Sequence, residues 1–510
     1  MVINKSLKQF FLSTKSINQL SKYKIDELTK IIVETYKCTL NDLPYRFIDI
    51  VCSKSIALIS SAKIYTQYNQ INNQNNNIVI PKSSVDLTVI ANEKILLENI
   101  YSISQQKFPF NFGFKNSVLD ESSKPKSVNK IYVIINIFFN PFKKKIFLDF
   151  IKLKLYFKLL FNGISPQFFI KEKHKLSTSS FYDRKLRINL FENARKIYET
   201  NLLKYKNIDI EDIYLLFALM PINIVENFNQ IYSGIKKKEK KNLFKLILGY
   251  QDGSDETNFW IANQVINMNS KLSFYQHGAS YNFIEYDYIN IYLESNSNIF
   301  YSWVKKESNK VKHFSFIKKI KKNIIQKNDL LLINNDWPFF SSFQSGPLGG
   351  MIEKNRNEQL YFLNNINYTN KILIKRPPNL YKGHLETYKK SPHSKYLTNN
   401  NIFKLIENTK IPVLSYIGTP FFEMMANDIP FLLFCKFSEN TMTKESSIYM
   451  KKFKSFGFWH HSGKSAADFL NKNHHNFLNL WRDKKVIEFR NDFKNKFCSH
   501  SNIWHKSFLE

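Results

Sequence analysis

A histidine beside a glycine ends an apolar run in the segment SFYQHGASYNF, residues 273–283. His277 follows Gln276 and precedes Gly278, and the glycine lets a ligand come close to the backbone N–H groups. An imidazole here could act as a general base or donate a hydrogen bond to a phosphate. The alternative is a loop histidine that only ends a strand. The small neighbours argue against it, because a structural histidine does not need them. We therefore expect Gln276, His277 and Gly278 to line a site.

A second candidate follows the apolar run of SYIGTPFFEMMAND, where Gly418 and Thr419 precede a proline. Pro420 suits the first position of a helix, so Thr419 would open one directly after a strand. A helix N-terminus in that place can bind an anion. Glu423 lies one helical turn further and could accept hydrogen bonds from ribose hydroxyls. The alternatives are a threonine that only caps the helix and a carboxylate that only suits its positive end.

Two further candidates close apolar runs in the same part of the chain. Arg376 ends KILIKR, and only eight of the 74 basic residues are arginine. A guanidinium could clamp a diphosphate with two parallel hydrogen bonds. Asn335 follows LLLI together with Asn334 and Asp336 and would line the same cleft. The alternatives are a surface ion pair for the arginine and an ordinary polar loop for the asparagine.

Several well-known motifs are absent from the sequence. It contains no GxxxxGK[ST], no HExxH and no GxSxG pattern. Acidic pairs of the DxD type, which would hold a catalytic metal ion, are missing from the expected cleft positions. We therefore expect a metal-independent protein without a cofactor.

The formal net charge of +32 favours anionic ligands and the negative face of a membrane. The excess comes from lysine, whereas specific nucleic-acid recognition relies on the bidentate fork of arginine. The charge therefore does not predict a specific nucleic-acid partner. It does allow contact with an anionic membrane surface.

The N-terminus and the cysteines bear on the compartment. No secretory signal is visible at the N-terminus, and lysines interrupt the most apolar segment, 128–170. The four cysteines are scattered without paired spacing, which suits a reducing environment. We expect a cytoplasmic protein, peripheral on the inner face of the cytoplasmic membrane.

The apolar pattern predicts two α/β series. A helical insertion over about 145–235 precedes a strand–helix–strand unit, and a basic run at 304–327 separates this unit from a second series. We expect an N-terminal α/β domain with this insertion, 1–320, and a C-terminal Rossmann-like domain with terminal helices, 321–510. Expected strands are 131–139, 243–250, 271–275, 329–336, 371–377, 411–418 and 429–434; expected helices are 255–269, 349–366, 400–409, 419–428 and two over 462–497.

The order of these motifs resembles a known family. DETNFWIA, KLSFYQHGASYNF, KRPPNLYKG, SYIGTPFFEMMANDIPFLLF and FGFWHHSGKSAADFLN follow one another as in the transferases encoded in bacterial surface-polysaccharide (O-antigen) clusters. The resemblance covers roughly residues 218–500. The chain departs from the family where Ala279 and Asn282 stand in place of glycine and Asn298 in place of aspartate. The GTxxxE pattern of Thr419 and Glu423 is intact.

The resemblance implies a GT-B-like architecture, in which two Rossmann-like domains face a cleft and C-terminal helices brace both. It also implies a glycosyltransferase that moves a sugar from a nucleotide-activated donor to a glycan or lipid-linked acceptor. Arg376, Gly418, Thr419, Glu423 and Asn335 would then bind the donor. His277 would be the catalytic base or an acceptor-side hydrogen-bond donor, and Gln276 and Gly278 would bind substrate or donor. Residues 1–320 would form the acceptor side and residues 321–510 the nucleotide-binding side.

Two alternatives remain open at this point. One is a phosphotransferase on the same scaffold, of the glycerophosphate-polymer type. The other is a non-catalytic basic protein that binds nucleic acid or an anionic polymer. Such a protein would need neither the QHG nor the GTxxxE pattern, so binding of a nucleotide sugar at physiological salt separates it from an enzyme.

Overall fold

The computed structural model describes most of the C-terminal half of the chain and selected segments before it. The described residues are 23–36, 56, 59, 63, 77–80, 95–104, 113–116, 164–166, 183–238, 246–249, 271–276, 278, 281–284, 293–294, 297–305, 308–313, 317, 319–323, 326–334, 350–368, 372–375, 388, 391, 393–435 and 442–500. The expected strand 131–139 and helix 255–269 lie outside them.

A six-stranded parallel sheet forms the second α/β unit. Its strands are β8 (Asn328–Ile333), β9 (Ile372–Lys375), β10 (Leu397–Thr398), β11 (Thr409–Leu414), β12 (Leu432–Phe434) and β13 (Trp459–His460). Their order across the sheet is β10-β9-β8-β11-β12-β13, and every pairing is parallel. In order along the chain this is 3-2-1-4-5-6, the arrangement of a Rossmann sheet. The predicted Rossmann-like fold of this region is confirmed.

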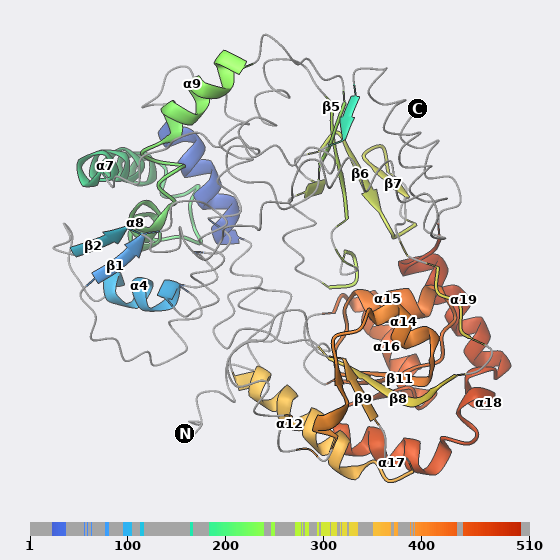
Figure 1. Cartoon of the computed structure of the whole chain (residues 1–510). Coiled ribbons are helices and arrows are strands. Elements are labelled where there is room, and N and C mark those ends of the chain that lie inside the picture. Colours follow the sequence, from blue (N-terminus) through green and yellow to red (C-terminus); the bar gives the residue numbers. More distant parts are fainter. Residues whose placement is uncertain are drawn as a thin grey trace.

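Helices cover both faces of this sheet. They are α12 (Gly350–Asn365), α14 (Ile402–Glu407), α15 (Thr419–Ala426), α16 (Lys444–Ser455), α17 (Gly463–Asn473), α18 (Phe477–Trp481) and α19 (Lys484–Phe497). Figure 1 shows α12 and α17 on one side of the sheet and α15 and α16 on the other. α12 and α17 pack closely against each other: a Cβ atom at Gly463 of α17 would lie 1.9 Å from the carbonyl oxygen of Glu358 of α12.

The end of the chain contains one helix more than expected. The region 462–497 was expected to form two helices, and it forms α17, α18 and α19. The extra boundary arises because the Asp483 side chain accepts a hydrogen bond from the N–H group of Lys485 and starts a new helix there.

A five-stranded parallel sheet forms the first α/β unit. Its strands, in spatial order, are β3 (Ile164–Pro166), β4 (Leu246–Gly249), β5 (Lys271–Tyr275), β6 (Ile299–Ser302) and β7 (Val311–His313). The predicted β5 has the observed bounds. Two expectations are corrected: β3 lies within the segment expected to be helical, and β7 lies within the basic run expected to be a linker. Strands of three residues are too short to give a recognisable apolar pattern.

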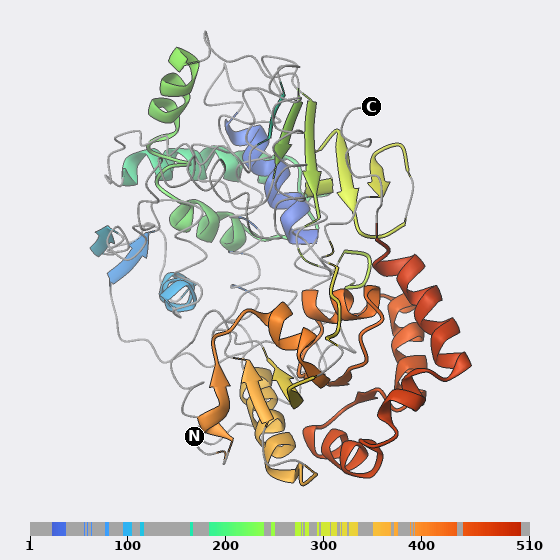
Figure 2. The ribbon, with the colours of Figure 1, turned by 45° about the vertical axis from the view of Figure 1, so that its right-hand side comes forward.

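The two sheets confirm the α/β class with two parallel-sheet units. Apart from a few aromatic residues, the buried side chains form separate clusters around each sheet. The helix α19 extends from the second unit toward the strands of the first (Figure 2). Just beyond its end, the hydroxyl of Ser499 lies 2.7 Å from Nε2 of His313 on β7. This contact fits the expectation that terminal helices brace both units.

A third group of elements precedes β4 in the chain, and only β3 of the two sheets lies within its span. It contains α4 (Ile95–Ser104), α7 (Arg184–Thr200), α8 (Ile210–Leu219) and α9 (Phe228–Lys238), a helix over 23–36, and the parallel pair β1 (Asn77–Ile80) and β2 (Gly113–Asn116). Arg187 holds this group together. Its guanidinium pairs with the Glu226 carboxylate at 2.6 Å and 2.7 Å and donates to the carbonyl oxygens of Phe217 and Met220 near the end of α8.

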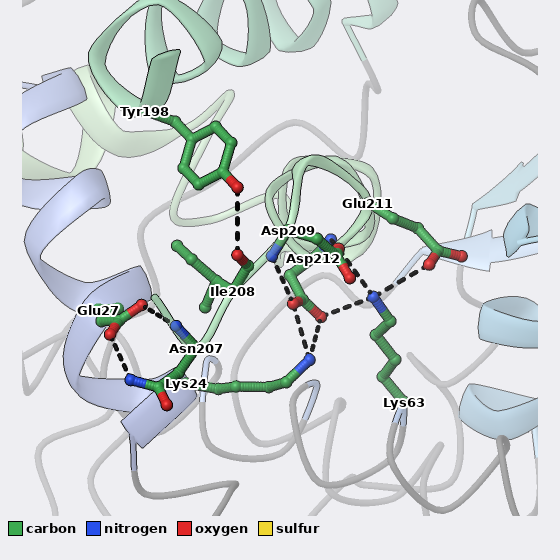
Figure 3. Close-up of polar contacts among 9 residues, drawn as sticks. All are labelled: Lys24, Glu27, Lys63, Tyr198, Asn207, Ile208, Asp209, Glu211 and Asp212. Carbon is green, nitrogen blue, oxygen red and sulfur yellow. Dashed lines mark hydrogen bonds and ion pairs between the residues drawn. The ribbon is translucent and has the colours of Figure 1, made fainter. Parts of the chain in front are cut away.

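Buried charges connect α8 to two segments that precede it by more than a hundred residues (Figure 3). Asp212 accepts hydrogen bonds from Lys24 Nζ at 2.7 Å and 3.0 Å and pairs with Lys63 Nζ at 2.7 Å. Lys63 also pairs with Asp209 and Glu211 at 3.2 Å and 3.1 Å. Asp209 and Asp212 form the reciprocal cap of α8. This group of five residues is called the lysine–aspartate network below.

None of the helices in the described part of the chain is long and apolar enough to cross a membrane.

Candidate functional site

The strand order of the six-stranded sheet defines where a ligand would bind. The order reverses between β8 and β11, which are neighbours in space but far apart along the chain. In open α/β sheets, ligands bind beyond the carboxyl ends of the strands at such a switch point. Asn334 follows β8, and Ser415 to Thr419 follow β11. Two of the segments singled out in the sequence therefore meet at this point.

The N-terminus of α15 lies at the switch point, with Gly418 as its capping residue. Gly418 has an extended backbone (φ −161°), so its conformation does not require glycine. Space does: a Cβ atom there would lie 2.5 Å from Cε2 of Tyr416. Gly418 contributes no side chain to cap the helix, and Pro420 occupies the first turn. The first-turn backbone and the Thr419 hydroxyl thus define the polar character of this helix end.

Glu423 lies one turn further along α15 and is buried. Burial, together with the nearby charge of Glu423, raises the pKa of Tyr416. Gly418 caps α15, and Thr419 and Glu423 lie in its first two turns.

The QHG turn of the first α/β unit faces this helix end. Gly278 adopts a positive φ of 67°, a conformation that glycine reaches at little cost. A Cβ atom at Gly278 would lie 3.7 Å from Oγ1 of Thr419. The two motifs, which belong to different sheets, are thus in van der Waals reach of each other. No side chain of residue 278 lies between them.

The buried side chain of Gln276 stabilises the turn through hydrogen bonds. Its Oε1 accepts from the Ser302 hydroxyl at 3.0 Å and from the Trp303 N–H at 2.9 Å, and its Nε2 donates to the Gly278 carbonyl at 2.8 Å. Its own N–H donates to the carbonyl of Tyr301. These bonds fasten the turn to the end of β6. The sequence singled out Gln276 as a site residue, and its contacts are those of a residue that positions the turn.

Three of the predicted site residues, His277, Asn335 and Arg376, lie outside the described residues. Their chain neighbours are described. His277 lies between Gln276 and Gly278 at the end of β5, Asn335 follows Asn334 at the end of β8, and Arg376 follows Lys375 at the end of β9. Their roles stay predictions.

A buried polar chain that the sequence did not suggest lies at the switch point. The amide of Asn334 donates to the Tyr388 hydroxyl, which donates to Oε1 of Gln359. Nε2 of Gln359 then donates to the hydroxyl of Ser415 at 3.1 Å. The chain joins the ends of β8 and β11 through α12. Gln359 and Tyr388, both helical, gave no sequence signal, because isolated polar residues in helices have no distinctive pattern.

Two departures from the family pattern keep the local geometry. Asn282 has a φ of 58°, the left-handed region that glycine favours and that asparagine tolerates better than most residues. Asn298 accepts a hydrogen bond from the Leu272 N–H through Oδ1 at 2.7 Å. An aspartate would accept the same bond. Both asparagines therefore have a local structural role that the residue expected from the resemblance could also fill.

The described residues contain no group of three or more histidine, cysteine, aspartate or glutamate side chains that could hold a metal ion.

Taken together, the chain is an α/β protein in which the strand ends of two parallel sheets bring a glycine-containing turn and a helix N-terminus into contact. Comparison with protein families makes the class specific. The model of the LIC12162 family of transferases matches residues 45–510, and the chain belongs to this family. It is a transferase, which confirms the resemblance seen in the motifs.

Solved structures give distant matches. A protein described as a UDP-N-acetylglucosamine 2-epimerase, from Listeria monocytogenes, is 10% identical, with a TM-score of 0.36 over 59% of this chain and 84% of its own. MurG from Acinetobacter baumannii is 12% identical, with a TM-score of 0.31 over 56% of this chain and 76% of its own. The comparison with curated proteins found no match.

Proposed function

We propose that this transferase moves a sugar from a nucleotide-activated donor to a glycan or lipid-linked acceptor of surface-polysaccharide synthesis. The observation that carries the proposal is the approach of Gly278 to Thr419. This approach brings the QHG turn, whose sequence includes His277, next to the N-terminus of α15 at the switch point of the Rossmann sheet. One motif can act on an acceptor while the other holds a donor.

The proposed roles follow from residue chemistry. The N-terminus of α15 and Arg376 hold the diphosphate and stabilise the charge that develops on the leaving group. Glu423 accepts hydrogen bonds from the ribose, and Asn335 contacts the donor from the end of β8. His277 takes the proton of the acceptor hydroxyl. This scheme needs no metal ion, so EDTA treatment should leave the rate unchanged.

Nucleotide binding tests the donor site. A thermal-shift screen with UDP, CDP, GDP and their sugars should find a ligand that stabilises the protein at physiological salt. Arg376→Ala should weaken diphosphate binding by about 1.5–3 kcal/mol, the value of a charge-assisted hydrogen bond. Glu423→Gln should weaken nucleoside binding more than binding of free pyrophosphate. If both variants bind the three nucleotides as the parent does, the donor site is misassigned.

Turnover tests the role of His277. His277→Asn should leave the affinity for the donor nearly unchanged and lower kcat by roughly 10²- to 10⁴-fold, the usual contribution of a positioned base. If affinity and turnover fall together, the histidine holds the donor phosphate instead. Product analysis distinguishes a sugar transferred to the acceptor from a phosphorylated acceptor, the product of a phosphotransferase.

We further propose that the protein works in the cytoplasm at the inner face of the membrane, where lipid-linked acceptors are made. The excess of basic over acidic residues, 74 against 42, supports this location, because anionic lipids attract such a charge.

A further inference from the structure

Two aromatic residues of the QHG segment, separated by a single residue, lie in different hydrophobic cores. Tyr281 belongs to the core of the five-stranded sheet. Its ring packs edge-on against Phe300 of β6 at 4.9 Å, and its hydroxyl donates to Glu294 at 2.5 Å. Phe283 belongs to the core of the six-stranded sheet and is only 1% exposed. The chain thus passes from one core to the other within three residues.

The ring of Phe283 packs against two helices of the six-stranded unit, α15 and α19. It contacts Phe421 and Phe422 of α15 at centroid distances of 6.2 Å and 4.9 Å. It contacts Phe493 and Phe497 of α19 at 6.1 Å and 5.2 Å. Phe283 therefore touches the same helix whose N-terminus faces Gly278. The segment 281–284 lies beside α15 in Figures 1 and 2.

The backbone of this segment is bonded to the start of α16. The Phe283 carbonyl accepts from the Thr443 N–H at 3.0 Å and from the Ser446 hydroxyl at 2.7 Å. The Asn282 carbonyl accepts from the Thr443 hydroxyl at 3.3 Å, and Ile284 forms an antiparallel bridge with Met442. These contacts involve backbone atoms of residues 282–284. They therefore hold the backbone of the segment in place, in addition to the ring of Phe283.

Asn282 links the two anchors. Its φ of 58° turns the chain between Tyr281 and Phe283. A β-branched residue is strongly disfavoured in this conformation, whereas glycine adopts it freely. The side chain of Asn282 is partly buried, so a fair comparison uses two replacements that both remove it.

We propose that Tyr281, Asn282 and Phe283 form an interdomain staple that positions the QHG turn against the N-terminus of α15. The inference rests on the proposed function, because it assigns these residues to the alignment of the acceptor side with the donor side. They touch neither substrate and act through the turn that precedes them. A misplacement of about 1 Å between reacting groups can cost about 100-fold in rate, so the staple affects turnover more than donor affinity.

Hydrogen exchange of the parent chain and a matched pair of variants tests the staple without a substrate. Asn282→Val and Asn282→Gly both remove the asparagine side chain, but only valine opposes the positive φ. Peptides that cover residues 274–281 should exchange about 5- to 30-fold faster in Asn282→Val than in the parent, the factor that corresponds to the cost of a left-handed residue. Asn282→Gly should match the parent. Equal exchange in the two variants overturns the proposal.

A second pair separates the staple from general loosening of the core. Phe283→Leu and Phe431→Leu remove rings from the same core, but Phe431 has no ring contact with Phe283 and packs against Phe421, Phe453 and Trp481. Phe283→Leu should speed exchange of the 274–281 peptides, and Phe431→Leu should not, even if both lower the melting temperature. If Phe431→Leu loosens the turn equally, Phe283 has no special role. If Phe283→Leu does not fold, the Asn282 pair decides.

Kinetics then connects the staple to turnover. With the UDP-, CDP- or GDP-sugar that the protein turns over, Asn282→Val should lower kcat by about 100-fold with little change in the KM for the donor, and Asn282→Gly should restore kcat. A parent chain that binds none of these nucleotides refutes the proposed function and leaves the exchange result intact. Normal kcat in a variant with a loosened turn refutes the positioning role alone.

Discussion

Single glycines decide how closely the two motifs approach. Gly278 needs glycine for its positive φ, and Gly418 needs it because the ring of Tyr416 occupies the space of a Cβ atom. The sequence singled out both residues. For Gly278 it predicts close approach of a ligand, which stays a prediction, and the structure adds the positive φ and the nearness of Thr419. The backbone at Asn282 is also left-handed, a conformation that glycine reaches at little cost.

Gly278→Ala should affect ligand binding more than folding. The added methyl group would lie 3.7 Å from Thr419 Oγ1, an ordinary contact, and the backbone strain costs about 1–2 kcal/mol. The methyl group would also occupy the space between the two motifs. We expect a modest loss of stability in denaturant unfolding and a clear loss of affinity for the nucleotide found in the thermal-shift screen.

Gly457→Ala is a matched control for this substitution. Gly457 also has a positive φ, 84°, and a Cβ atom there would press on Phe469 at 2.7 Å, far along the sheet from the switch point. This variant should lose at least as much stability as Gly278→Ala and bind the nucleotide normally. Equal losses of affinity in both variants would mean that the effect of Gly278→Ala is only a loss of folded protein.

Tyr388→Phe tests the buried chain at the switch point. It removes the hydroxyl that joins Asn334 to Gln359 and leaves two buried amide groups without this partner. A buried polar group left unpaired costs about 1–3 kcal/mol, so the free energy of unfolding should fall by that amount. Tyr396→Phe, in a partly exposed tyrosine of the same region, is the control and should have little effect. Unchanged unfolding of Tyr388→Phe would show that the chain adds no stability.

At the scale of elements, the lysine–aspartate network should hold the N-terminal helices together. Asp212 is the partner of two buried lysines, so Asp212→Asn leaves both without their closest counter-charge. Breaking a buried ion pair costs about 3–5 kcal/mol. Glu211→Gln removes an exposed member and should cost at most about 1 kcal/mol. Urea unfolding followed by circular dichroism compares the two, and similar midpoints would contradict the assignment.

The same network predicts a pH dependence. Burial alone would raise the pKa of Asp209, but the charge of Lys63 and the backbone bond from Asp212 outweigh it and lower this pKa below 3.8. Asp209 therefore contributes stability above about pH 4, and the contribution is lost as the pH falls through the lowered pKa. Burial alone would lower the pKa of Lys63, but the charge of Asp212 outweighs it and raises this pKa above 10.5.

The contribution of Lys63 is complete below pH 10.5 and is lost as the pH rises through the raised pKa. The melting temperatures of the parent and of Lys63→Met should therefore differ most between about pH 4 and pH 10.5. They should converge at lower and at higher pH. A difference that stays constant from pH 3 to pH 11 would rule out a charge effect.

How far the sequence predicts each element depends on its length and pattern. Buried parallel strands are continuous apolar runs, so β5, β8, β9 and β11 could be located from the sequence. β10 and β13 have two residues each and leave no pattern. α16 escaped prediction because only three of its residues are buried, Ser446, Met450 and Phe453, which is too few for a visible apolar face. Local sequence likewise does not show which hydrophobic core an aromatic residue enters. The sequence therefore predicts that the QHG turn and the N-terminus of α15 share a cleft, but not which residues bring them together.

At the scale of the whole molecule, the net charge of +32 predicts reversible binding to anionic lipid. Each lysine near such a surface contributes about 1 kcal/mol at low salt. The protein should sediment with vesicles that contain phosphatidylglycerol at 50 mM salt and leave them at 500 mM. Pure phosphatidylcholine vesicles are the control. Equal binding to both kinds of vesicle would point to an apolar contact instead of a charge effect.

Because Phe283 lies between two units, its contacts form late when the chain folds during synthesis. Its partners Phe493 and Phe497 are translated about 210 residues later, which takes roughly 10–40 s at bacterial speeds. Until then the ring cannot reach its final neighbours, even if the first sheet has already formed. The contacts of Phe283 with α19 can therefore form only after residue 497 has been translated. A prematurely terminated chain would hold the histidine segment without the geometry that makes it useful.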